Sequence, residues 1–75
     1  MQRYFFDLYN ASHVHHDFSG RYFNRPTDAR EMAELIALDA AFDSDASAGI
    51  EVQVRDSAGR HWFTVPVLAA DQVAA

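Results

Sequence analysis

The fold of this chain is decided by three consecutive segments: Ile50-Glu51-Val52-Gln53-Val54-Arg55, Asp56-Ser57-Ala58-Gly59 and Arg60-His61-Trp62-Phe63-Thr64-Val65. Apolar and polar residues alternate in the first segment, turn-forming residues fill the second, and β-forming residues return in the third. The pattern predicts a β-hairpin with one buried face.

The length of the hairpin loop sets the register of the two strands. A four-residue loop predicts three pairs with the aliphatic side chains inward: Val54 with His61, Val52 with Phe63, and Ile50 with Val65. That register leaves four side chains outward: Glu51, Gln53, Trp62 and Thr64. A three-residue loop with Gly59 in a bulge shifts the pairing by one, so it stays open whether Trp62 or Phe63 faces the core.

The N-terminal region predicts two more strands. Residues Arg3 to Tyr9 are rich in β-formers. Alternation places Tyr4, Phe6 and Leu8 on a core face, and Arg3, Phe5, Asp7 and Tyr9 on an outer face that is half apolar. Residues His13 to Phe18 are expected to return as the second strand, which Arg21-Tyr22-Phe23 extends beyond a bulge at Gly20.

A helix is expected from Asp28 to about Phe42, because Ala is frequent there and Gly and Pro are missing. Thr27 or Asp28 is the predicted cap. One apolar stripe of small residues suits packing on a sheet: Ala29, Met32, Ala33, Ile36 and Ala40. A second stripe holds Leu35, Leu38 and Phe42, with Asp39 between the two. A helix on a sheet needs one stripe only, so a monomer does not explain the second.

These segments predict an α+β fold with ββαββ order, a four-stranded antiparallel sheet with one helix packed on one face. A chain of 75 residues is expected to hold one domain, residues 1–68, with a C-terminal tail over 69–75. There is no Cys for a disulfide, so self-association is the remaining common route to extra stability.

The composition also weakens several functional classes. All six basic residues are Arg and Cys is missing, which removes Schiff-base lysines, phosphate-loop lysines and thiol nucleophiles. A formal net charge of −5 opposes binding to nucleic acid. No apolar run is long enough to span a membrane and no signal peptide is recognisable, so a cytoplasmic location is expected.

The ordered motifs resemble a family of short bacterial proteins of unknown function. The chain opens with Arg3-Tyr4-Phe5-Phe6-Asp7-Leu8, continues with the turn Asp17-Phe18-Ser19-Gly20, and carries Ala29 and Ala33 on its helix. It closes with the Val-x-Asp-x-x-Gly-Arg hairpin from Val54 to Arg60 and with Thr64-Val65-Pro66. The resemblance covers about residues 2 to 67. It implies the ββαββ layout and assigns no activity, cofactor or functional residue.

One group of residues suggests metal binding. On a strand, His13, His15 and Asp17 share a face, and a His-x-His pair with a carboxylate can ligate zinc. The stretch follows a turn, however, and a solvated histidine patch is the more common outcome of such a pattern. No cofactor is predicted, and no catalytic constellation of nucleophile, base and oxyanion donors is recognisable.

The surplus of apolar residues predicts a noncatalytic protein-interaction module that acts as a homodimer. The expected interface residues are Leu35, Leu38 and Phe42 on the helix, with Phe5, Tyr9 and Trp62 on the outer sheet face. The alternative is a small-ligand-binding or sensor domain, with its cleft between helix and sheet or between subunits. A His-rich metal-binding protein is a lesser alternative.

Overall fold

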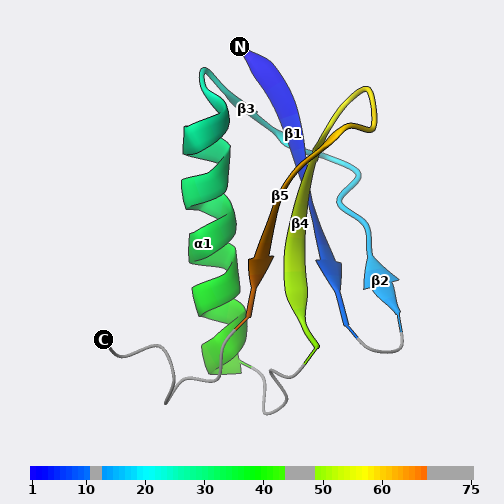
Figure 1. Cartoon of the computed structure of the whole chain (residues 1–75), viewed down its shortest axis with the longest axis vertical. Coiled ribbons are helices and arrows are strands. Elements are labelled where there is room, and N and C mark those ends of the chain that lie inside the picture. The colour runs from blue at the N-terminus through cyan, green and yellow to red at the C-terminus, as the bar shows by residue number, and fades with distance from the viewer. Residues whose placement is uncertain (11–12, 44–48, 68–75) are drawn as a thin grey trace.

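The computed structural model describes residues 1–10, 13–43 and 49–67 (Figure 1). Residues 11–12 and 44–48 and the expected C-terminal tail over 69–75 lie outside these ranges. The side chains of Phe42 and Asp43 are likewise not described. No helix in the described part of the chain is long and apolar enough to cross a membrane.

An antiparallel sheet and a single helix make up the described chain, which confirms the α+β class. The strands are β1 (Gln2–Tyr9), β2 (Val14–His15), β3 (Arg21–Phe23), β4 (Glu51–Asp56) and β5 (His61–Pro66). Their order is β2-β1-β4-β5, and β3 pairs with the same edge of β1 as β2 does. The expected second strand is therefore present but divided into two short pieces.

Asp17 explains how β1 tolerates this divided neighbour. Strand β2 pairs Leu8 with His15, whereas β3 pairs Tyr4 with Arg21, so the middle of β1 has no strand beside it on that edge. There the backbone N–H of Phe6 donates to the Asp17 carboxylate over 3.1 Å. A buried N–H without a partner would cost free energy, and the side chain replaces the missing ladder bond.

Helix α1 (Pro26–Asp43) begins two residues earlier than the sequence suggested. Proline suits the first helical position, because its fixed φ is helical and its missing N–H needs no partner there. Thr27 and Asp28 therefore lie inside the first turn, and the prediction that one of them caps the helix is wrong. The Asp28 carboxylate instead accepts from the Arg25 guanidinium at 3.2 Å, close to the positive end of the helix dipole.

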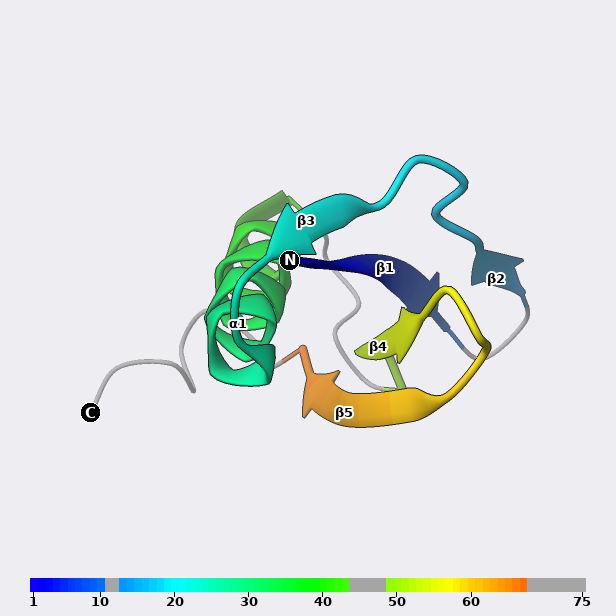
Figure 2. The ribbon, with the colours of Figure 1, turned by 90° about the horizontal axis from the view of Figure 1, so that it is seen from above.

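The helix packs mainly over β4 and β5 and also touches β3 (Figure 2). Its contact face is a row of buried alanines at four-residue spacing: Ala29, Ala33, Ala37 and Ala41. Small side chains let the helix approach the sheet closely. Burial of Ala29 and Ala33 confirms part of the predicted stripe, while Met32, Ile36 and Ala40 flank the row at half burial.

Tyr4, Phe6, Val52 and Val54 cover the sheet side of this core, and Val67 closes it beyond β5. Strand β1 therefore presents the face that alternation predicted. Leu8 packs at the margin of the same cluster.

The register predicted from a four-residue loop is wrong. Val52 pairs with Val65 and Val54 with Phe63, while Arg55 pairs with His61, so a β-bulge at Trp62 separates two registers. Arg55 and His61, the pair next to the turn, have the register expected from a three-residue loop. Beyond the bulge the register is shifted by one further residue. Both Trp62 and Phe63 consequently pack against the core.

Candidate interaction surface

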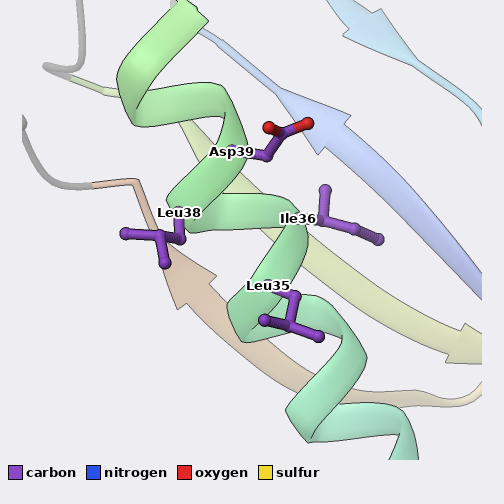
Figure 3. Close-up of a pocket in the computed structure, with 4 residues that line it drawn as sticks. All are labelled: Leu35, Ile36, Leu38 and Asp39. Carbon is purple, nitrogen blue, oxygen red and sulfur yellow. The ribbon is translucent and has the colours of Figure 1, made fainter.

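Two leucines form an exposed apolar ridge on α1, on the side away from the alanine row. Leu35 is 60 % exposed and Leu38 is 38 % exposed. We call these two residues the leucine ridge (Figure 3). The expectation of a second, unburied helix stripe is confirmed for them, whereas the side chain of Phe42 lies outside the described part of the chain.

Phe5 is not part of an exposed patch, contrary to the sequence-based expectation. Its ring is 9 % exposed although it points to the outer face of the sheet. The Arg55 guanidinium carbon lies 4.6 Å from the ring centroid and that of Arg3 lies 4.9 Å away. These cation–π contacts and the turn at Gly20 cover the ring, so Phe5 is unavailable to a partner.

The remaining two expected interface residues behave differently from each other. Tyr9 is half-buried at the end of β1, opposite Glu51 of β4. Trp62 packs inward against Tyr4, with ring centroids 6.1 Å apart, because the bulge turns it toward the core. Its predicted place on the outer sheet face is therefore wrong.

A buried carboxylate lies under the outer face. Asp7 is 1 % exposed. Arg55 Nε donates to its Oδ2 at 2.7 Å, and the backbone N–H of Asp17 donates to Oδ1 at 2.9 Å. Nδ1 of His16 lies 3.5 Å from the same Oδ1. Burial alone would raise the pKa of Asp7, but the hydrogen bonds from Arg55 and Asp17, with the nearby charges, hold that pKa below its ordinary value.

Asp17 organises the turn that covers this cluster. Its Oδ1 accepts from the backbone N–H groups of Ser19 and Gly20, and its Oδ2 accepts from Phe6. Burial opposes its charge, yet these backbone donors lower the pKa of Asp17 below the ordinary carboxyl value. Arg3 then fastens the turn to β1, because its guanidinium donates twice to the Ser19 carbonyl, at 2.6 and 2.9 Å.

Asp56 has the same role at the hairpin tip. Its Oδ2 accepts from the indole N–H of Trp62 at 3.0 Å, and its Oδ1 accepts from the backbone of Ala58 and Arg60. These donors, that of Trp62 above all, lower the pKa of Asp56. The three buried or half-buried aspartates therefore hold turns and strands together.

The proposed metal ligands are not brought together. The rings of His13 and His15 lie 5.3 Å apart, but both oxygens of Asp17 are engaged by backbone N–H groups. Among the residues that the structure describes, no group of three or more His, Cys, Asp or Glu side chains is placed to hold a metal ion.

A cleft opens between α1 and the strands β1 and β2, on the side of the helix that carries Ile36 and Asp39. Its volume is about 380 Å³. Half-buried apolar side chains line it from both elements: Leu8, Ile36, Ala40 and Ile50. Exposed His15 and Asp39 border it together with Asn10. The position of Asp39 between two apolar stripes was the only sequence signal for this cleft.

A family model described as "Domain of unknown function (DUF6894)" matches residues 3–69, which is nearly the whole chain. No curated protein and no solved structure matches the sequence.

Proposed function

This chain belongs to the DUF6894 family, whose description assigns no activity, and we propose that it is a noncatalytic interaction module that pairs with a second copy of itself. The observation that carries the proposal is the leucine ridge. Leu35 is 60 % exposed in the middle of a regular helix whose other face already packs on the sheet. Exposed apolar surface of this kind is typical of interaction sites.

Self-association suits the ridge for geometric and energetic reasons. Two copies related by a twofold axis would bring each ridge against the other, so one surface patch supplies both halves of the interface. The crossing of two helices then buries Leu35 and Leu38 by ordinary side-chain interdigitation. A chain of 75 residues without Cys has a thin core and gains stability from an added partner.

The test is the solution mass of tag-free protein, measured by size-exclusion chromatography with light scattering over a range of concentrations. We expect twice the chain mass for the wild type and the single chain mass for Leu35→Glu with Leu38→Glu. Phe18→Glu is the matched control, because Phe18 is 85 % exposed and lies outside α1, so this variant should stay dimeric.

A monomeric wild type at every concentration would overturn the proposal, and so would a doubly substituted variant that remains dimeric. Circular dichroism of each variant shows that the fold is kept. Because both leucines are exposed, their substitution removes little core packing.

A second candidate function, the binding of a small ligand, is favoured by a different feature. The cleft beside Ile36 combines an apolar lining with polar groups at its border, which is the usual composition of ligand sites.

A further inference from the structure

The cleft divides into an apolar interior and a polar border. Leu8 from β1, Ile36 and Ala40 from α1 and Ile50 before β4 are all half-buried, so each offers part of its hydrocarbon surface to the cleft. Asp39 and His15 stand exposed at the border. A ligand that fits both parts needs an apolar body and a polar head.

The charge at the border is negative. Two other acids of α1 are neutralised, because Asp28 pairs with Arg25 at 3.2 Å and Glu34 with Arg30 at 3.6 Å. Asp39 has no ion pair within the described ranges 1–10, 13–43 and 49–67. No described arginine lines this cleft either. Arg21 borders the adjoining hollow, which shares Leu8, His15 and Ile36 with the cleft, and its guanidinium donates to Met32 Sδ at 3.6 Å.

We infer that this cleft binds small organic cations, in which an ammonium group is carried on a hydrocarbon body. The hydrocarbon lies over Leu8, Ile36 and Ile50, and the ammonium group lies at the Asp39 carboxylate. A carboxylate ligand of the same shape meets Asp39 with like charge, and a neutral alcohol lacks the charge-assisted contact. The formal net charge of −5 also favours the approach of a cation over that of an anion.

This site lies beside the proposed dimer contact, because Ile36 and Asp39 also line a shallow hollow together with Leu35 and Leu38. Figure 3 shows Ile36 and Asp39 pointing to the side of β1, whereas Leu38 points to the opposite side of the helix. From Ile36 and Asp39 the cleft extends toward Leu8 and His15, away from the ridge. Failure of either proposal leaves the other standing, because one is read from the mass and the other from ligand binding.

The experiment is a titration of uniformly ¹⁵N-labelled, tag-free full chain, followed by amide NMR shifts. The probes are hexylammonium, 1-hexanol and hexanoate, which share a hydrocarbon body and differ in the head group. We expect saturable shifts at the amides of Leu8, Ile36 and Ile50 with hexylammonium, at a dissociation constant on the order of millimolar for so small a probe. Hexanol should bind more weakly, and hexanoate should bind most weakly of the three.

Asp39→Asn keeps the size of the side chain and removes its charge. For an exposed carboxylate we expect about three- to five-fold weaker binding of hexylammonium, with hexanol binding unchanged. Glu34→Gln is the matched control, because it makes the same charge change on the same helix outside the cleft lining, and it should leave the affinity within about twofold.

Three results would overturn the inference. One is the absence of saturable shifts at the cleft amides with hexylammonium. Another is equal affinity for hexanoate and hexylammonium. The third is an equal loss of hexylammonium affinity in Asp39→Asn and Glu34→Gln, which would assign the effect to net charge rather than to the cleft.

Discussion

Arg55 on β4 holds the carboxylate of Asp7 on β1, with 2.7 Å between Nε and Oδ2, at a site where Asp7 is 1 % exposed. The same guanidinium reaches the Asp17 carbonyl at 3.2 Å and lies over the ring of Phe5. One side chain therefore joins two strands and the turn that covers them. The outer face of the sheet is thus covered by a polar network that includes Asp7, Asp17 and Arg55.

Removal of Arg55 should cost much more stability than removal of an exposed arginine. Arg55→Ala leaves a buried carboxylate without its counter-charge, and we expect a loss of about 3 kcal/mol in the free energy of unfolding. Urea denaturation followed by far-UV circular dichroism measures this loss. Arg25→Ala, which removes the exposed pair with Asp28, should cost no more than about 0.5 kcal/mol. Similar losses in the two variants would show that the buried pair contributes little.

Acid should destabilise the fold. The pKa values of Asp7, Asp17 and Asp56 are lower in the folded chain than the ordinary carboxyl value. Folding therefore favours their ionised forms, so their contribution is complete above about pH 5 and is lost as pH falls further, through the lowered pKa values. The urea midpoint should be steady from pH 7 to about pH 5 and should fall below that. An unchanged midpoint at pH 3 would contradict the assignment of these aspartates.

Alanine substitutions at Gly20 and Gly59 distinguish the cost of backbone strain from the cost of a steric clash. Both have positive φ, 71° and 86°, so alanine at either position costs about 1–2 kcal/mol in backbone strain. A Cβ at Gly20 would also lie 3.0 Å from Phe5 Cε2 and from the Tyr4 carbonyl, whereas nothing lies within 4 Å of one at Gly59. We expect Gly20→Ala to be the more destabilising by about 1 kcal/mol or more, by chemical denaturation. Equal effects would mean that the turn moves freely off β1.

A larger side chain at position 33, in place of Ala33, should destabilise the fold. Its side chain is fully buried between α1 and the sheet, and Ala33→Leu would push the helix away or force strained rotamers. We expect a loss of about 1–3 kcal/mol, or failure to fold in so small a domain, read from the thermal midpoint. Leu35→Ala, two residues away on the exposed ridge, should change the free energy of unfolding of the monomer by no more than about 0.5 kcal/mol. A mild Ala33→Leu would show that the helix is loosely packed.

Periodicity predicted the strands, the helix and the core face of β1, because each depends on local alternation. It could not predict the hairpin register, because a bulge at Trp62 changes which face each later residue occupies without changing the residue pattern. The Asp56 carboxylate, which binds the Trp62 indole and the Arg60 backbone, stabilises that arrangement. Such a contact becomes visible only when the strands are paired.

The burial of side chains on the outer sheet face could not be predicted from the sequence either. Alternation predicted that Phe5 and Asp7 lie on this face, and they do. Both side chains are nevertheless buried rather than exposed. The turn around Asp17 and the side chains of Arg3 and Arg55 cover them, and these residues are far apart in the chain. The helix surface was easier to predict, since Leu35 and Leu38 are set apart from the alanine row by helical spacing alone.

Strand order has a consequence for the synthesis of this protein. β1 precedes the other strands of this sheet, is central in it, and pairs from Tyr4 to Tyr9 with β4, which follows the helix in the sequence. During translation β1 must wait, with Tyr4 and Phe6 uncovered, until residues 51–56 have left the ribosome. Contacts between such distant segments slow folding. A nascent chain stalled after α1 would therefore have a helix but no sheet centre to receive it, and it would be an exposed target for chaperones and proteases.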